Sequence, residues 1–236
     1  MVQKQTNNLV VKKNELIQKA RYALSTQEQK LLLYAISKVK PDDTQLYEYD
    51  FDLGEMCRTL GITMNGKNYA NIRAALQSIR DKSFWIHDGN VKKLCAWISG
   101  AEIFEKEARV RIQLDKRLMP YLLEIRESYT AYQLKNVLGM KSKYSIRLYE
   151  IFKSYANLGE YSVSVEDLQN ALQVNGYSNY VDFRKRVLDV AIGEINSLTD
   201  ITVTYTPIKT GRFITHFNFR IARKDLEGEH GISDNS

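Results

Sequence analysis

Two short stretches that repeat one another decide the fold: residues 68–73 read Asn-Tyr-Ala-Asn-Ile-Arg, and residues 179–184 read Asn-Tyr-Val-Asp-Phe-Arg. About 110 positions separate them, an interval long enough for one small domain. A helix-like stretch at residues 31–38 precedes the first copy, and it shares Leu-Tyr-x-Ile with residues 145–153, which precede the second. The chain is therefore predicted to contain an internal duplication.

Each copy continues with a short extended stretch and then a capped helix. Asp52 is followed three residues later by Glu55, and Ser164 by Asp167, a spacing that resembles a capping box at a helix start. Apolar residues then recur at i, i+3 and i+7, which predicts one buried helical face in each copy. They are Leu53, Met56 and Leu60 in the first copy, and Val165, Leu168 and Leu172 in the second.

A third helix and a β-hairpin complete each copy. The apolar positions of the helix are Tyr69, Ile72, Leu76 and Ile79 in the first copy, and Tyr180, Phe183, Val187, Val190 and Ile195 in the second. The hairpins are expected at residues 83–99, around Asp88-Gly89-Asn90, and at residues 201–221, around residues 209–212. Helix, strand, helix, helix and hairpin is the element order of a winged helix.

We therefore predict an α+β protein made of tandem winged-helix domains related by internal duplication. The expected N-terminal domain spans residues 8–127, and the C-terminal domain spans residues 128–224. Residues 225–236 are expected to form an acidic tail without a fixed structure. The alternative is an α+β repeat with no role in nucleic-acid binding.

Charge is unevenly distributed along the chain. The sequence has 34 Lys and Arg against 28 Asp and Glu, a net charge of +6. Four acidic residues lie after Lys224, where there is no Lys or Arg, so the folded body carries about +10 and should attract a polyanion. An ordinary soluble protein with a basic isoelectric point is the simpler interpretation of the charge alone.

The third helix of the second copy is the predicted DNA-reading element. If Phe183, Val187 and Val190 face the core, Lys185 points away from it, with Arg184 and Arg186 on either side. Such residues at the start of a recognition helix reach base edges, and Arg can make bidentate contacts with guanine. Just before the helix, Ser178 and Asn179 are expected to cap it or to bind a phosphate.

The first copy differs at the same helix. Arg73 is the counterpart of Arg184, so both arginines can instead serve a shared structural role such as an ion pair. Lys185 and Arg186 have only alanines as counterparts, which favours DNA contact for these two. The outward residues of the first helix suit packing or a weaker DNA contact; they are Ala70, Ala74, Gln77 and Asp81.

Further cations are candidates for phosphate contacts that set the register of the protein on DNA. They are Lys141 and Lys143 before the long helix of the second copy, Lys209 and Arg212 at the second hairpin, and Lys92 and Lys93 after the first hairpin turn. Each taken alone is also compatible with a solvated surface charge.

The sequence lacks the motifs that several classes of function require. Neither GxxxxGK[ST] nor GxGxxG occurs, and His87, His216 and His230 are too scattered to bind a metal as a pair. A rolling-circle nicking enzyme needs such a His pair beside its tyrosine. Cys57 and Cys95 have no CxxC spacing and are expected to be buried, reduced thiols. We predict a protein that is not an enzyme, with no catalytic residues, cofactor or metal.

The longest apolar run, residues 31–36, is much shorter than the roughly 20 residues that span a bilayer, and residues 1–8 are polar and lack the apolar core expected of a signal peptide. The expected location is the cytoplasm, without membrane association.

The chain resembles the initiator Rep proteins of iteron-containing plasmids, the family of the RepA, RepB and RepE initiators. The most specific matching stretch is Phe-Arg-Lys-Arg-Val-Leu-Asp at residues 183–189. Other matching stretches lie at residues 8–10, 24–31, 194–200 and 207–212, in the order of the family.

The resemblance implies tandem winged helices that bind direct repeats (iterons) in double-stranded origin DNA and recruit host replication proteins. It places Arg184, Lys185 and Arg186 on the DNA-reading helix. Many members of the family also form a homodimer through the first domain and repress their own promoter. The alternatives are a transcriptional repressor without an initiation role and an assembly protein whose winged helices bind only protein.

Overall fold

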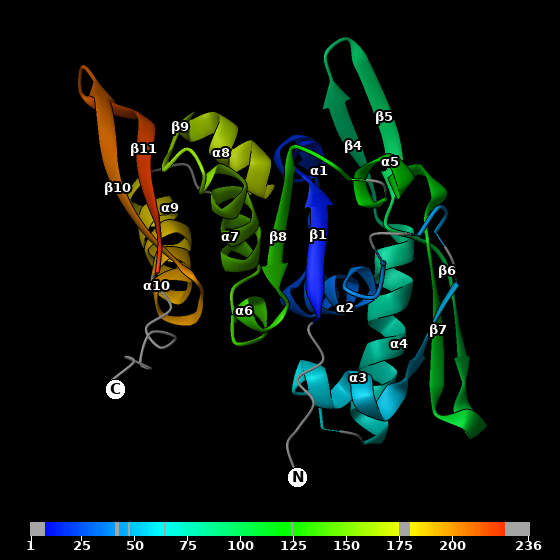
Figure 1. The fold of residues 1–236 in the computed structure, drawn as a ribbon. Coiled ribbons are helices and arrows are strands. Elements are labelled where there is room, and N and C mark those ends of the chain that lie inside the picture. Colours follow the sequence, from blue (N-terminus) through cyan, green and yellow to red (C-terminus); the bar gives the residue numbers. More distant parts are fainter. Residues whose placement is uncertain are drawn as a thin grey trace, which may run out of the picture.

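The computed structural model describes residues 8–40, 43–46, 48–63, 65–123, 125–174 and 180–224, which form two lobes (Figure 1). The elements of the first lobe are β1 (Leu9–Lys13), α1 (Asn14–Lys19), β2 (Ala20–Arg21), α2 (Thr26–Ile36), β3 (Glu48–Asp52), α3 (Leu53–Leu60), α4 (Gly66–Asp81), β4 (Ser83–Asp88), β5 (Val91–Ala96), β6 (Ile98–Phe104), β7 (Arg109–Leu114) and α5 (Met119–Leu122). Those that follow are β8 (Tyr129–Gln133), α6 (Lys135–Leu138), α7 (Lys143–Tyr155), β9 (Glu160–Ser164), α8 (Val165–Leu172), α9 (Tyr180–Phe183), a π-helical segment (Arg184–Leu188), α10 (Asp189–Leu198), β10 (Ile201–Thr210) and β11 (Phe213–Arg223).

Side-chain caps fix the starts of the helices that the duplication predicts. Asp52 accepts a hydrogen bond from the Glu55 amide at 2.6 Å at the start of α3, and Ser164 accepts one from the Asp167 amide at 2.9 Å at the start of α8. Both predicted caps are confirmed. The reciprocal capping box lies elsewhere, at the start of α2, where Ser25 and Glu28 each bind the other's backbone amide.

The second domain has the strand pairing of a winged helix. Its sheet has the order β10-β11-β9, and all pairs are antiparallel. β9, which lies between α7 and α8, thus pairs with β11, the last strand of the wing. Gly211 turns the β10–β11 hairpin with φ +62°, a left-handed conformation that favours glycine.

The first domain contains the same pairing, but in strands other than those expected. The order of its equivalent sheet is β3-β7-β6, so β6 and β7 occupy the places of β10 and β11. The prediction that the hairpin of residues 83–99 is the first wing is therefore wrong. That hairpin exists as β4–β5, but it forms a separate sheet with β2. Alternation of apolar residues indicates a strand, but it does not indicate the partner of that strand.

A strand pair and several hydrogen bonds join the two lobes. β1 pairs with β8 from Leu9 opposite Gln133 to Lys13 opposite Tyr129. Three side chains of α1 and α2 also bind groups of α6 and α7 or the turn between them: Gln18 binds Ser154, Gln29 binds the Lys143 carbonyl, and Lys30 binds the Leu138 carbonyl. The pairing of β1 with β8 joins the two lobes across the predicted boundary at residues 127 and 128. The fold does not test that boundary, which therefore stays a prediction.

Among the described residues, no helix is long and apolar enough to cross a membrane. No group of three or more His, Cys, Asp or Glu side chains in this part of the chain is arranged to bind a metal ion. Cys57 and Cys95 are both free thiols and both buried, as the sequence predicts.

Candidate nucleic-acid interface

The predicted DNA-reading helix is not a regular α-helix. Residues Arg184–Leu188 form a π-helical turn between α9 and α10, and the Asp189 amide donates to the Arg184 carbonyl, five residues back. The wider turn changes which side chains face inward. Leu188 and Ala191 are fully buried, whereas Val190 is 44% exposed. The prediction that Val190 lies in the core is therefore wrong, because it assumed a uniform 100° per residue.

The three consecutive cations of this segment differ in exposure. Lys185 is exposed, and the Arg186 side chain is 69% exposed with Asp182 at 3.9 Å. Arg184 is less exposed, at 39%, and its Nε lies 3.6 Å from Asp189 Oδ2. Lys185 and Arg186 thus project from the helix as predicted, and the ion pair that was the alternative role of Arg184 is present.

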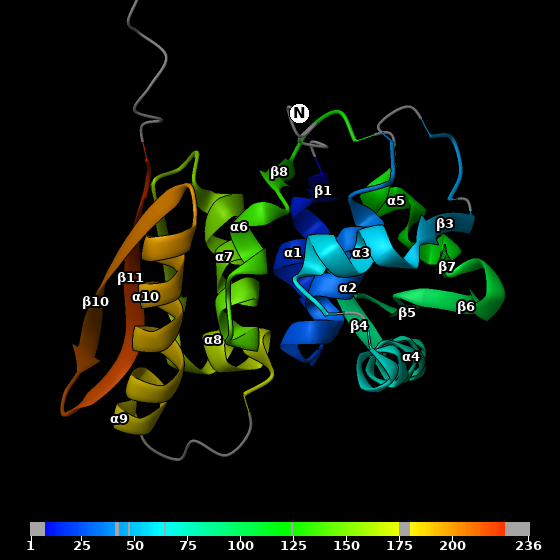
Figure 2. The same cartoon turned by 90° about the horizontal axis from the view of Figure 1, so that it is seen from below.

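An aromatic cluster holds this helix against the wing. The Phe217 ring of β11 lies 5.9 Å from Tyr180 and 6.4 Å from Phe183, centroid to centroid. Tyr205 of β10 packs edge-on against Phe217 at 5.6 Å. Further along, the Asn196 side chain exchanges two hydrogen bonds with the backbone of Val203 on β10. The helix and the wing are therefore packed together through aromatic contacts and hydrogen bonds, and they lie side by side in Figures 1 and 2.

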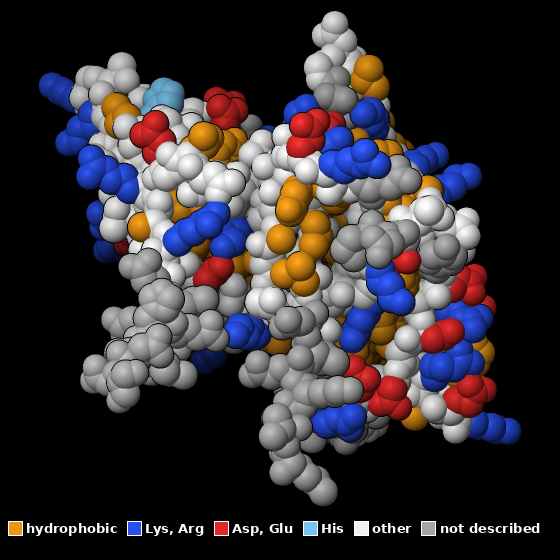
Figure 3. Space-filling model, in the orientation of Figure 1, with side chains coloured by type: hydrophobic (Ala, Val, Ile, Leu, Met, Phe, Trp, Pro, Cys, Tyr) orange, Lys and Arg blue, Asp and Glu red, His pale blue; other side chains and the backbone are white. Residues whose placement is uncertain are grey.

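The wing carries cations and no acidic residue. β10 and β11 contain Lys209, Arg220 and Arg223 without any Asp or Glu, and Arg212 lies in the turn between them. Figure 3 shows Lys and Arg side chains along the edge of the molecule formed by these strands. The structure thus brings Lys209 and Arg212 onto the same basic wing, as the sequence predicts, beside the helix that carries Lys185 and Arg186.

Lys141 and Lys143 lie apart from this basic surface. The Lys141 amide donates to Glu194 Oε1 at 3.0 Å. Because Glu194 follows Arg186 by eight residues, Lys141 lies about 12 Å further along the helix than Arg186, at 1.5 Å per residue. The Lys143 ammonium lies over its neighbouring Tyr144 ring at 4.9 Å. A duplex bound at the wing has to extend along the helix before it reaches this pair.

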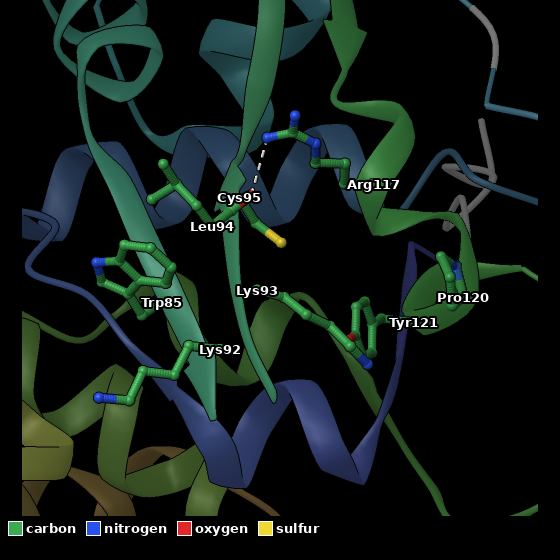
Figure 4. Close-up of a pocket in the computed structure, with 8 residues that line it drawn as sticks. All are labelled: Trp85, Lys92, Lys93, Leu94, Cys95, Arg117, Pro120 and Tyr121. Carbon is green, nitrogen blue, oxygen red and sulfur yellow. Dashed lines mark hydrogen bonds between the residues drawn. The ribbon is translucent and has the colours of Figure 1, made fainter. Parts of the chain in front are cut away.

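Lys92 and Lys93 are further away still. Both lie on β5, in the other lobe from the wing in Figure 1. The Lys93 ammonium lies 3.4 Å from the Tyr121 hydroxyl (Figure 4). These two lysines are not brought together with the second-domain cations. Ser178 and Asn179 fall outside the described residues.

The third helix of the first domain, α4, lies on the same side of the molecule as α9, and both are at the lower edge in Figure 2. Its predicted outward residues Ala70, Ala74, Gln77 and Asp81 are all exposed. Lys67 and Arg80 are exposed on the same helix and are not among the residues predicted from the sequence. Their spacing from the buried Ile72 and Ile79 places both side chains away from the buried face of the helix, so the sequence pattern could have identified them as exposed cations.

Two family models match the chain in tandem. Residues 9–153 match the WH1 domain of the initiator replication proteins, and residues 164–221 match the WH2 domain of the initiator Rep proteins. The first match includes β8 and most of α7, which the sequence-based division assigns to the second domain.

One solved structure of an initiator protein with DNA has the same fold. A crystal structure of the Pi initiator protein in complex with iteron DNA is similar over 94% of this chain and 99% of its own, with a TM-score of 0.73 and 18% identity. Two structures of domains 2 and 3 of RctB each cover 86% of the chain, with TM-scores of 0.49 and 0.48 and 10% and 12% identity. The chain therefore belongs to the initiator replication protein family and has the tandem winged-helix fold of its WH1 and WH2 domains.

Proposed function

We propose that this protein initiates plasmid replication by binding direct repeats in double-stranded origin DNA through its second winged helix. One observation carries the proposal: the exposed Lys185 and Arg186 project from a helix fixed against a wing that carries cations and no acidic residue. The similar Pi initiator was crystallised with iteron DNA, which supports the same class of partner.

The residues divide into two roles. Arg184, Lys185 and Arg186 reach base edges in the major groove, where a good bidentate contact adds about 1–3 kcal/mol of discrimination. Lys209 and Arg212 of the wing bind phosphates, and Ser178 and Asn179 do so before the helix. Because α4 lies on the same side of the molecule, Lys67 and Arg80 add a weaker contact further along the duplex.

The protein acts by binding rather than by catalysis of its own. It distorts or marks the origin in the cytoplasm and recruits host replication proteins, which supply the enzymatic steps. The match to the initiator replication protein family favours this function over that of a winged-helix repressor without an initiation role. Direct repeats clustered beside the gene on a small replicon favour the initiator.

A gel-shift titration with a duplex carrying one direct repeat tests the reading helix. Replacing both Lys185 and Arg186 by Ala should weaken binding at least tenfold and flatten the preference over a shuffled duplex. Replacing both Lys92 and Lys93 by Ala removes the same charge from β5 and serves as the matched control, with less than a threefold effect expected. Equal losses for the two double variants would show that the helix does not read the repeat.

We further propose that the protein forms a homodimer through its first domain, at the β4–β5 hairpin. Trp85 and Leu94 are cross-strand partners and remain 46% and 42% exposed. They border an open hollow of about 630 Å³ whose other wall includes Pro120 and Tyr121 (Figure 4). β5 is also an edge strand of its sheet, and exposed edge strands readily pair with another chain.

A further inference from the structure

Asp189 is a point where the reading helix and the wing meet through side chains. Its Oδ1 accepts a hydrogen bond of 2.8 Å from the hydroxyl of Tyr205, which lies on the wing strand β10. Its other oxygen, Oδ2, lies 3.6 Å from Nε of Arg184. One carboxylate thus connects a tyrosine of the wing to the first cation of the π-helical segment.

The π-helical turn makes this arrangement possible. Residues five apart on a regular α-helix point about 140° away from each other, so Arg184 and Asp189 would face different sides. In this segment the Asp189 amide donates to the Arg184 carbonyl, which stacks the two residues on the same face. The irregular turn therefore creates the pair.

Asp189 is held in place rather than free to rotate. The Tyr205 ring packs against Phe217 and Phe219, with centroids 5.6 and 5.8 Å away. Burial raises the pKa of Tyr205 and the bond to Asp189 raises it further, so the hydroxyl keeps its proton and remains a donor at neutral pH. The carboxylate is consequently fixed in the orientation that faces Arg184.

We infer that Asp189, anchored by Tyr205, is a positioning residue that orients the Arg184 guanidinium for reading a base. The inference rests on the proposed function. A carboxylate 47% exposed beside DNA repels phosphates, so on charge alone it weakens binding to any duplex. Positioning and charge therefore predict opposite effects when Asp189 is neutralised.

The test compares two duplexes of equal length, one with a direct repeat from the origin beside the gene and one with a shuffled sequence. Asp189→Asn should lower the ratio of specific to non-specific affinity about tenfold, while affinity for the shuffled duplex stays the same or increases up to about threefold. Tyr205→Phe keeps the ring and removes the hydroxyl, so it should change the ratio in the same direction by a smaller factor.

Glu166→Gln is the matched control. Glu166 is exposed in the first turn of α8, whereas Arg184 and Arg186 pair with Asp189 and Asp182. Its neutralisation removes an equal charge and should leave the ratio within about twofold. Base-pair substitutions along the repeat should show that Asp189→Asn loses discrimination at one or two positions and keeps it at the others.

A double-mutant cycle separates positioning from other roles. In an Arg184→Ala background, Asp189→Asn should have no further effect on the ratio, because the group that it orients is gone. Tighter binding of both duplexes with an unchanged ratio would overturn the inference, as would an equal loss on both with a lower unfolding temperature. A wild-type protein that binds both duplexes equally would instead refute the proposed function.

Discussion

Glu150 lies at the junction of the two lobes, with only 1% of its side chain exposed. Lys12 forms an ion pair with it, and the hydroxyls of Tyr132 and Tyr22 donate to its two oxygens at 2.6 and 3.3 Å. Burial on its own would raise the pKa of this carboxyl, but the charges of Lys12 and Arg147, together with the hydrogen bonds from Lys12 and Tyr132, outweigh burial and hold the pKa below its usual value. The ionised form is therefore the stable one in the folded protein.

Glu150→Gln should be strongly destabilising because it leaves Lys12 buried without its counter-charge, at a cost of about 3–5 kcal/mol. Urea unfolding at pH 7 measures the change, and the double variant Lys12→Met, Glu150→Leu is the control, expected to recover much of the loss. Because the folded pKa is depressed, the stabilisation is present above the carboxyl's unfolded pKa and is lost as pH falls through the folded pKa. The difference between wild type and Glu150→Gln should accordingly shrink below about pH 4. A difference that is constant from pH 7 to pH 3 would contradict this assignment.

At the scale of one element, the π-helical turn predicts that two valines of the same helix respond differently to the same substitution. Val187 is fully buried and Val190 is 44% exposed. Val187→Ala should lower the free energy of unfolding by about 2 kcal/mol, and Val190→Ala by less than about 0.5 kcal/mol. Urea unfolding of both variants checks the prediction. Similar losses at the two positions would indicate an uninterrupted α-helix with the register that the sequence pattern predicts.

In this helix, the sequence pattern predicts the burial of some side chains correctly and of others incorrectly. Spacing placed Phe183 and Val187 in the core and Lys185 and Arg186 outside it, because over these few residues the π-helical turn has shifted the phase only slightly from that of an α-helix. Past the π-helical turn the phase is shifted, so the pattern failed at Val190. The pairing of Arg184 with Asp189 was likewise hidden, since five-residue spacing is not a contact in a regular α-helix.

The strands show a different limit. The pattern located the β4–β5 hairpin and its turn, because alternation and a Gly-containing turn are local properties of the chain. Which hairpin pairs with β3 is decided by contacts between segments far apart in sequence. Lys92 and Lys93 were therefore assigned to a wing from which the sheet topology separates them.

At the scale of the whole molecule, the β4–β5 hairpin and the basic wing belong to different lobes and stand apart in Figure 1, although both point toward its upper edge. A dimer formed at Trp85 and Leu94 thus leaves the reading helix accessible, so self-association and DNA reading should be separable by mutation. Replacing Trp85 and Leu94 by Ser should convert a dimer to a monomer in sedimentation experiments at micromolar concentration, because both apolar contacts at the centre of the interface are lost.

The same double variant should bind a single direct repeat with an affinity within about threefold of wild type, because none of the cations on the reading helix or the wing is altered. Phe213→Ser is the matched control. Phe213 lies at the start of β11, beside the wing turn, and is 78% exposed, a larger exposed fraction than that of Trp85 or Leu94. Its replacement therefore removes an exposed apolar side chain and leaves the β4–β5 hairpin unchanged. It should leave the dimer intact. If Phe213→Ser dissociated the dimer and the Trp85, Leu94 variant did not, the contact between protomers would have to involve the wing, and dimerisation would compete directly with DNA for the same surface.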